Sequence, residues 1–493
     1  MVMSSQLFQS LIYLALAVGL TACGGGGGSP SDITSSTTST SAPTQSSVDS
    51  VTQGFAQSIL LAAPTDSSIR ISVLSPMTGV LTLAYQANLA MQAIALQAGI
   101  ITPDIPREIY LSDLKPNTRY TYTLSLQTGT STLVSPTYSF TTARTEGSSF
   151  TFTLQADSHL DENSDLDVYK RTLANVLLDL PDFHIDLGDT FMTEKHSEPL
   201  SATLQAATSA MVVNKRYLYE RYNFGLITHS VPLFLVNGNH DGELGWLLNG
   251  TPNALPIWAT TARQTYFSNP QANAFYLGDN KKDPFTGERS SWYAWHWGDA
   301  LFVVLDPFWN SPLQSNKDGW NLTLGSNQYQ WLSKTLSESK AKHKIIFIHN
   351  LVGGLDGQMR GGIEAAPYFE WGGKNLDGSP GFSSRRPGWE LPIHELLVKH
   401  QVKAVFHGHD HLYAQQSLDG IIYQTVPQPS AKNFNSGTTL ARDYHYDSGV
   451  VLSSSGHLRI KVTPTSISSE YVRSWLPSQE NASRKNRQVD ASW

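Results

Sequence analysis

Five strand-like apolar runs in this chain each end in Asp, Asn or His, and this recurrence restricts the fold more than any other feature. The runs are "FTFTLQADSH" (150–159), "DFHIDLGD" (182–189), "FLVNGNHD" (234–241), "IIFIH" (345–349) and "VFHGHDH" (405–411). Helical patterns alternate with several of them, which predicts an α/β domain. In open α/β sheets, ligand-binding groups gather at the carboxyl ends of strands, so these side chains predict one shared site.

The segments between the runs support this layered domain. The stretch "LDVYKRTLANVLLDL" places its apolar residues on one helical face, which makes the first two runs the strands of a βαβ unit. Helices are also predicted for "NQYQWLSKTLSES" and "LPIHELLVKH", and hairpins for "SWYAWHWGDALFVVLD" and "HLRIKVTPTSISSEYV". The α/β domain is expected from about residue 148 to 475, followed by a loose polar tail over 476–493.

The residues that end the strands are suited to metal binding. Taken singly, each is an ordinary turn former or a structural histidine. Two residues apart on a strand, as in Asp-x-His and His-x-His, side chains point to the same side. Carboxylate oxygens combined with imidazole nitrogens suit Zn, Mn or Fe. The candidate ligands of a two-metal site are Asp157, His159, Asp189, Asn239, His349, His409 and His411.

The order Asp-x-His, Gly-Asp, Gly-Asn-His-Asp, His, Gly-His-Asp-His resembles the calcineurin-like metallophosphoesterase superfamily, from residue 151 to about 475. The resemblance implies a four-layer α/β/β/α sandwich holding two divalent metal ions. It implies that the first metal is held by Asp157, His159 and His411. It implies that Asn239, His349 and His409 hold the second metal and that Asp189 bridges the pair.

The resemblance also implies a reaction. His240 would stabilise or protonate the leaving oxygen, and Asp241 would hold the His240 ring, although Asp241 could instead cap the helical stretch that follows it. Two metal ions would convert a bridging water to hydroxide, which attacks phosphorus in line. The expected enzyme is a phosphatase acting on exported or environmental phosphomonoesters. The alternatives are a phosphodiesterase or nucleotide hydrolase, and an inactive surface lipoprotein with a binding or adhesion role.

Residues 50–144 predict a small all-β domain. Short alternating apolar runs are separated by Gly, Pro, Asp and Ser, and "LKPNTRYTYTL" resembles the tyrosine corner of fibronectin type III domains. Tyr120 would then bond back to the chain. The domain order, with a β-sandwich before the α/β domain, resembles that of the purple acid phosphatases. Two residues of this chain depart from that branch. This chain has His159 where that branch has Gly, and Met192 where it has a Tyr ligand, so an Asp-x-His type of metal site is expected.

A long segment between the fourth and fifth runs, residues 357–389, predicts a loop over the site. Its candidate substrate-binding residues are Arg360, Arg385 and Arg386, because guanidinium groups grip phosphate oxygens; a solvated surface role is the alternative for each. Trp371 and Trp389 could stack on a substrate or pack beneath the loop.

The start of the chain predicts export. Residues 1–22 read as a signal peptide, and Leu20-Thr21-Ala22-Cys23 resembles the lipobox of bacterial lipoproteins, although no Lys or Arg occurs in the first ten residues. Residues 23–49 read as a flexible Gly/Ser/Thr linker. Cys23 would carry the lipid, which implies the outer membrane and a periplasmic or cell-surface site. The small phosphorylated substrate is the expected partner, because the net charge of -7 argues against nucleic-acid polymers.

Overall fold

The computed structural model of the chain describes residues 58–88, 92–195, 207–313, 318–351, 353 and 360–493. All of them lie in the unit from Ser46 to Trp493. Cys23, the predicted signal peptide and the predicted linker lie outside the described residues. Within the described ranges, no helix combines the length and the apolar character that a membrane span requires.

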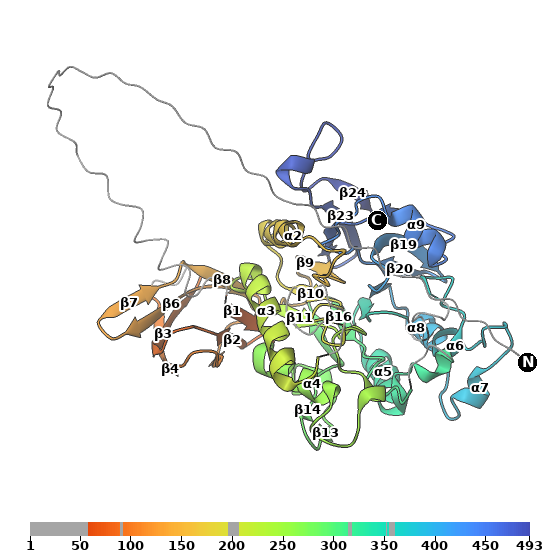
Figure 1. Ribbon diagram of the computed structural model, residues 1–493, viewed down its shortest axis with the longest axis horizontal. Helices are drawn as coiled ribbons and strands as arrows, with labels where there is room; N and C mark the ends of the chain where they lie inside the picture. Colours follow the sequence, from red (N-terminus) through yellow and green to blue (C-terminus); the bar gives the residue numbers. More distant parts are fainter. Residues whose placement is uncertain (1–57, 89–91, 196–206, 314–317, 352, 354–359) are drawn as a thin grey trace, which may run out of the picture. The chain divides into compact units, whose positions relative to one another are not determined.

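The first described part, residues 58–144, is a sandwich of two antiparallel sheets (Figure 1). One sheet contains β1 (Ile59–Ala62), β2 (Ile69–Val73) and β5 (Arg107–Leu111). The other contains β3 (Gly79–Ala87), β4 (Ile94–Ile101), β6 (Arg119–Thr128), β7 (Ser131–Val134) and β8 (Tyr138–Thr141). The Tyr120 hydroxyl accepts a hydrogen bond of 2.8 Å from the Lys115 N–H, which is the expected tyrosine corner. The predicted fibronectin type III-like fold is therefore confirmed.

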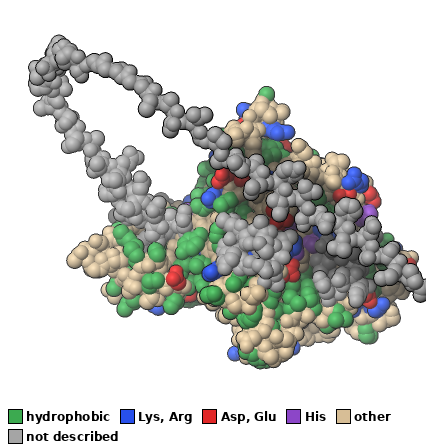
Figure 2. All heavy atoms as spheres, viewed as in Figure 1, with side chains coloured by type: hydrophobic (Ala, Val, Ile, Leu, Met, Phe, Trp, Pro, Cys, Tyr) green, Lys and Arg blue, Asp and Glu red, His purple; other side chains and the backbone are tan. Residues whose placement is uncertain are grey.

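The surface of this sandwich carries apolar side chains among polar ones (Figure 2). Val80, Ile100 and Tyr110 are among the exposed members. Inside, alternate residues such as Leu81, Leu83 and Leu124 form a separate apolar core, because successive side chains of a strand point to opposite faces.

The sandwich is joined to the α/β domain by a shared sheet. Ala62 of β1 pairs in parallel with Leu233 of β11 (Leu233–Leu235), so β1, β2 and β5 extend a sheet of the α/β domain. Side chains reinforce the junction: Tyr122 donates to the carbonyl oxygen of His229 at 2.6 Å, and Arg144 pairs with Asp182 at 2.6 Å. The two predicted domains thus share one hydrogen-bonded sheet.

Two sheets face each other in the α/β domain, and helices cover their outer sides (Figure 1). Among the described residues, the first sheet has the order β24-β23-β22-β9-β10-β11-β1-β2-β5 and the second β12-β15-β16-β17-β18-β20-β19-β21. Phe152, Phe302 and Phe347 belong to the core between the sheets. Their neighbours Leu301 and Val303 point instead to the helices beyond the second sheet. The strands are buried on both faces, as their continuous apolar runs predict, and the four-layer α/β/β/α fold is confirmed.

The helices divide between the two outer layers. The first sheet is covered by α2 (Leu166–Leu178), α3 (Ala210–Thr228) and α4 (Leu255–Tyr266), whose apolar residues share one core with β11. The second sheet is covered by α5 (Gly325–Glu338), α6 (Phe369–Gly372) and α8 (Ile393–Lys399). Two more short helices are α7 (Phe382–Arg385) and α9 (Gly437–Asp443), and single 3-10 turns are η1 (Gly245–Leu247), η3 (Gly319–Asn321) and η4 (Pro477–Gln479).

The parallel strands confirm the predicted βαβ arrangement. In the first sheet β9 (Phe150–Gln155), β10 (His184–Asp186) and β11 run parallel, and α2 connects the first two. In the second sheet β16 (Ala300–Val304), β17 (His343–Phe347), β18 (Ala404–His407) and β20 (Ile421–Thr425) run parallel. The carboxyl ends of β9, β10 and β11, and of β17 and β18, therefore lie at one edge of their sheets, which is where the site forms.

The remaining strands complete the sheets. They are β12 (Leu277–Gly278), β13 (Lys282–Asp283), β14 (Gly287–Glu288), β15 (Tyr293–Trp297), β19 (Leu412–Leu418), β21 (Val450–Ser453), β22 (Gly456–Val462), β23 (Ile467–Arg473) and β24 (Val489–Ser492). Both predicted hairpins are present, as β15–β16 and β22–β23.

The end of the chain differs from its prediction as a loose tail. β24 pairs with β23, and the Trp493 indole donates a 2.8 Å hydrogen bond to Gln424. The Trp493 ring also stacks near Phe406. The polar composition of 476–493 was misleading, because an edge strand needs only one neighbouring strand and one apolar anchor to be held in place.

Candidate metal centre

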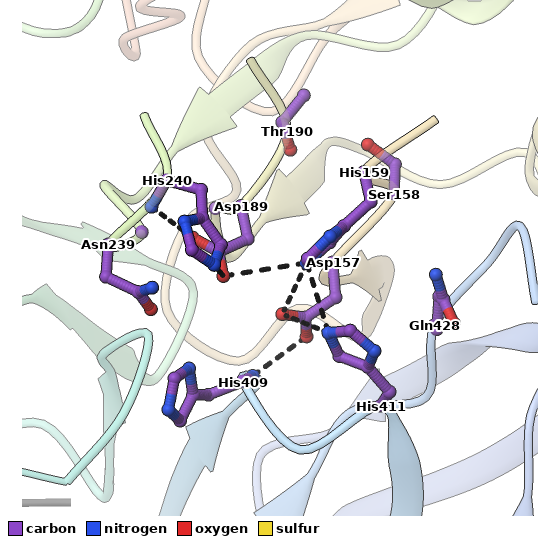
Figure 3. Close-up of polar contacts among 12 residues, drawn as sticks. Asp157, Ser158, His159, Asp189, Thr190, Asn239, His240, His409, His411 and Gln428 are labelled. Carbon is purple, nitrogen blue, oxygen red and sulfur yellow. Dashed lines mark hydrogen bonds and ion pairs between the residues drawn. The ribbon is translucent and has the colours of Figure 1, made fainter. Parts of the chain in front are cut away.

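The structure brings all seven predicted metal ligands together at the carboxyl ends of the parallel strands. Figure 3 shows the side chains of Asp157, His159 and His411 pointing toward one another, with Asp189 beside them. The donors form two groups, and within each group the donor atoms lie within 4.8 Å of one another: Asp157, His159 and His411 in one, and Asp189, His349 and His409 in the other. Each group contains one carboxylate and two imidazoles.

The first group is drawn together by strands from both sheets. Nε2 of His159 lies 3.1 Å from Nε2 of His411 and 3.8 Å from Oδ1 of Asp157. Nε2 of His411 lies 3.6 Å from the same Asp157 oxygen. These atoms therefore converge on one point although Asp157 and His411 are more than 250 residues apart in the sequence.

The second group lies next to it, and Asp189 adjoins both. Oδ2 of Asp189 is 3.1 Å from Nε2 of His349 and 3.6 Å from Nε2 of His159. Oδ1 of Asn239 lies 3.1 Å from the same His349 nitrogen, which adds the neutral oxygen donor that the sequence predicted. A single carboxylate thus faces donors of both groups.

The backbone at the site is unusual for residues other than glycine. Asp157, His159, Asp189, His409 and His411 have φ between 52° and 74°, in the left-handed region. Such conformations cost of order 1 kcal/mol each and concentrate at functional sites. Close backbone approach also shapes the site: a Cβ on Gly238 would lie 2.2 Å from the Asp189 amide nitrogen, so only glycine lets these two loops touch.

Hydrogen bonding of the buried donors fits metal binding. His349 and His159 each engage Nδ1 elsewhere, with the Leu187 carbonyl at 2.8 Å and with Asp161 at 3.2 Å, which leaves Nε2 facing the cluster. This is the usual arrangement of metal-bound histidines. Oδ1 of Asp157 and both ring nitrogens of His409 are buried without a hydrogen-bond partner among the described residues. The donor set of carboxylates, imidazoles and an amide oxygen therefore fits divalent metal ions.

The charges at the site favour a cation. Burial raises the pKa of Asp189, but His349 and His240 outweigh it and hold that pKa well below its usual range. Burial lowers the pKa of His349, whereas the negative charge of Asp189 raises it to about 9. Burial and the neighbouring His159 lower the pKa of His411 to about 4, so that ring is neutral and its nitrogen lone pair is available. The buried carboxylates create a negative field that a proton or a metal cation can satisfy.

The structure gives the two residues of the predicted catalytic pair different surroundings. His240 lies at the cluster, with its Nε2 3.9 Å from Oδ2 of Asp189, but Asp241 does not hold its ring. The Asp241 carboxylate instead accepts backbone N–H bonds of 2.7 to 3.1 Å from Gly238, Asp189, Thr190 and Phe191. The ring partner is Glu194, whose Oε1 contacts Nδ1 of His240.

Sequence reasoning missed Glu194 and Asp161. Glu194 follows Asp189 in an irregular loop, and no periodic pattern places its side chain. Asp161 stands two residues after His159, where an Asp is an ordinary turn residue. Sequence proximity gave no signal for Glu194, because it lies 46 residues from His240.

The predicted substrate-binding arginines have structural partners. Arg385 pairs with Asp318 at 3.1 Å, and Arg386 pairs with the buried Glu370 and donates to the Trp320 carbonyl at 2.6 Å. None of these three contacts involves a candidate metal ligand. Arg360 contacts the ligand-bearing loop itself, through Asp410 at 2.6 Å. The predicted substrate role is thus not supported by these contacts.

The two tryptophans of the same segment pack rather than face the site. The buried Trp371 indole donates to the Tyr423 hydroxyl at 2.9 Å. Trp389 stacks on Tyr329 with ring centroids 3.9 Å apart. Of the two roles left open by the sequence, packing is the one that the contacts favour.

Together, the four-layer fold and this donor set define the class of metal-dependent phosphoesterases. The sequence model of the calcineurin-like phosphoesterase family matches residues 150–413, more than half of the chain. The chain belongs to this family and is a metallophosphoesterase.

Solved structures agree with the fold. The structure of PhoD is 13% identical in sequence, with a TM-score of 0.58 over 86% of this chain and 87% of that one. The purple acid phosphatase PPD1 from yellow lupin (Lupinus luteus) seeds is 17% identical, with a TM-score of 0.55 over 88% of this chain and 73% of that one. A sequence comparison with curated proteins gave no significant match.

Proposed function

We propose that this protein hydrolyses phosphoric monoesters at a site that holds two divalent metal ions of Zn, Mn or Fe type. The observation that carries the proposal is the position of Asp189, whose Oδ2 lies 3.1 Å from His349 and 3.6 Å from His159. A carboxylate placed between two sets of donors is suited to bridging two cations. The similarity in fold to PhoD and to a purple acid phosphatase supports a phosphatase.

The chain's own residues have distinct tasks in this proposal. Bound divalent ions supply Lewis acidity and lower the pKa of coordinated water. His240 is the group placed to donate a proton or hydrogen bond to the leaving oxygen, because its Nδ1 is engaged by Glu194 while Nε2 faces the cluster. Asp157 and Asp189, both buried, hold the negative charge that retains the cations near the substrate.

The test compares two chromogenic substrates. The purified protein, stripped with a chelator and reloaded with Zn²⁺, Mn²⁺ or Fe²⁺, is assayed with para-nitrophenyl phosphate and bis(para-nitrophenyl) phosphate. We expect turnover of the monoester that depends on added metal. Turnover of the bis ester alone would replace the proposal by a phosphodiesterase.

The Asp189→Asn variant provides the matched structural test. An amide is a weak bridging ligand, so we expect this variant to lose both bound metal, measured by elemental analysis, and turnover. If neither ester is cleaved at any metal loading, the alternative of an inactive surface protein with a binding or adhesion role is favoured.

We further propose export and attachment to the outer membrane through a lipid on Cys23, which places the site where environmental phosphomonoesters occur. This proposal rests on the apolar run and the Leu-Thr-Ala-Cys sequence at residues 20–23. Labelling with radioactive palmitate in a bacterial host should mark the protein but not its Cys23→Ala variant. An unlabelled wild-type protein in the soluble fraction would contradict the anchor.

A further inference from the structure

The loop between β18 and β19 carries two candidate ligands, and the side chain between them has other partners. His409 and His411 flank Asp410, whose side chain is 3% exposed. The Asp410 carboxylate accepts hydrogen bonds of 2.9 and 2.6 Å from Nε and Nη2 of Arg360 and one of 2.7 Å from the Tyr446 hydroxyl. The carboxylate is thus held from two separate segments of the chain.

Arg360 also forms a hydrogen bond with the main chain of the same loop. Its Nη2 donates to the carbonyl oxygen of His409 at 3.0 Å, and its guanidinium lies 3.8 Å above the Tyr444 ring. The Arg360 side chain is only 12% exposed. A planar guanidinium with donors in fixed directions can hold a carboxylate and a carbonyl at once, which an ammonium group cannot do.

These contacts of Arg360 matter because no hydrogen bond to a described residue orients the ring of His409, which lies edge-on to the His349 ring with centroids 5.2 Å apart. His349 and His159 are oriented by hydrogen bonds at Nδ1, whereas neither ring nitrogen of His409 has a described partner. The position of the His409 main chain, whose N–H also donates to Oδ2 of Asp157 at 2.8 Å, therefore helps to set where the ring lies. That main chain is in the left-handed region, with φ of 74°, and needs support from its surroundings.

The support continues into the second sheet. The Tyr446 hydroxyl lies 3.0 Å from Oγ1 of Thr425 on β20, and that oxygen lies 3.2 Å from Nε2 of His407 on β18. A buried chain of hydrogen bonds therefore runs from the sheet through Tyr446 and Asp410 to Arg360. It also gives a structural role to His407, which is not among the seven candidate metal ligands.

We infer that Arg360 is a positioning residue that acts through Asp410 and the His409 carbonyl to set the affinity of the site for the metal ion bound by His409. The inference rests on the proposed two-metal function and adds to it. The carbonyl of the other histidine of the loop, His411, has a different partner, because Ser454 donates to it at 2.9 Å. The effect of Arg360 is therefore asymmetric between the two metals.

The experiment measures metal binding directly. The metal-free full-length protein is titrated with Mn²⁺, and free Mn²⁺ is followed by electron paramagnetic resonance for the wild type and for Arg360→Gln. We expect the dissociation constant of one of the two sites to rise about 10- to 100-fold, the usual cost of removing a group that supports a ligand. The other site should change much less, and excess Mn²⁺ should restore turnover with an unchanged KM.

Two further variants control the result. Arg459→Gln removes a comparable partly exposed arginine, which pairs with Asp179 at 2.7 Å and Glu470 at 2.8 Å, and should leave both Mn²⁺ constants unchanged. Tyr446→Phe removes only the hydroxyl that holds Asp410, and should weaken the same site by a smaller factor. If Arg360→Gln does not fold, Tyr446→Phe decides the question by the same titration.

The outcomes distinguish a failure of the two-metal function from a failure of the positioning role of Arg360. A wild-type protein that binds fewer than two Mn²⁺ ions would refute the two-metal function. A wild type that binds two ions, beside an Arg360→Gln variant with wild-type constants, would overturn only the positioning role. A raised KM with unchanged Mn²⁺ constants would also overturn it, and would return Arg360 to substrate binding.

Discussion

Oε1 of Glu194 contacts Nδ1 of His240, and this contact fixes which nitrogen of the ring faces the candidate metal ligands. The two residues come from different loops, since Glu194 follows β10 and His240 follows β11. A carboxylate at Nδ1 favours the tautomer with its proton on that nitrogen, which leaves Nε2 to face the cluster.

Replacement of Glu194 by Gln should lower turnover without removing metal. Glu194 touches the ring and no candidate ligand in the described contacts, so metal content should stay at the wild-type level. We expect kcat for para-nitrophenyl phosphate to fall about 10- to 100-fold, because the ring loses its orienting charge. The kcat of His240→Ala should fall further, and this variant should keep its metals.

The matched control for this prediction is Glu338→Gln, an exposed carboxylate on α5. It should leave kcat unchanged. Loss of bound metal in Glu194→Gln would show instead that Glu194 supports the metal ligands.

Asp241→Asn should act on stability rather than on proton transfer. Its carboxylate ties the loop of Asp189 to the loop of Gly238 through four backbone N–H groups, and it is buried. An amide would turn its NH₂ toward some of these donors and leave them unpaired. The free energy of unfolding, measured by urea denaturation, should fall by about 3 kcal/mol, and bound metal should decrease. If Asp241→Asn loses turnover but keeps its stability, the predicted role of Asp241 in holding the His240 ring would be favoured instead.

The fold and the metal ligands could be predicted because they have strong local patterns. Runs such as "ALFVV" of β16 are apolar at every position, since Phe302 faces one core and Leu301 and Val303 face another. The ligands follow such runs directly, and parallel strands place their ends at one edge. The position of each ligand at the end of a strand was therefore enough to predict that the seven side chains lie together.

Features that depend on buried polar contacts were not predictable in the same way. α3 lacks a clear apolar face, because Arg216, Glu220 and Arg221 are buried alongside its apolar residues. The partners of Glu194 and Asp410 come from loops, where no periodicity indicates direction. Arg360 was predicted from its charge alone, which cannot distinguish a phosphate from the buried carboxylate that it contacts.

A buried group behind the Gly-Asn-His-Asp loop should make stability depend on pH. Glu243 is 1% exposed and pairs with Arg263 at 2.5 Å and Arg289 at 3.0 Å. Burial raises the pKa of Glu243, but the two arginines outweigh it and lower the pKa from 4.5 to about 2. Because the folded-state pKa is depressed, this stabilisation is fully present above pH 4.5 and is lost as the pH falls toward 2.

The measurement is the difference in free energy of unfolding between the wild type and Glu243→Gln. At neutral pH the variant should be less stable by about 3 to 5 kcal/mol, because the buried Arg263 loses its counter-charge, whereas Arg289 keeps Asp306 at 3.0 Å. Between about pH 5 and pH 2 the difference should shrink by about 3 kcal/mol, the equivalent of the pKa depression. Other acidic groups titrate equally in both proteins, so a difference independent of pH would contradict the assignment.

The sandwich should unfold together with the α/β domain, because a buried arginine joins them. Arg221 of α3 is 1% exposed, and its Nη2 donates to the carbonyl oxygens of Ser72 at 3.0 Å and Ser58 at 3.2 Å. Arg221→Met should therefore leave buried carbonyls unpaired and reduce the free energy of unfolding by about 3 kcal/mol. Arg119→Met, which replaces an exposed arginine on β6, should change the free energy of unfolding by less than about 0.5 kcal/mol.

Urea denaturation followed by far-ultraviolet circular dichroism and by tryptophan fluorescence should give coincident transitions for the wild type. The described tryptophans lie outside residues 58–144, so an earlier change in circular dichroism alone would mean that the sandwich unfolds independently.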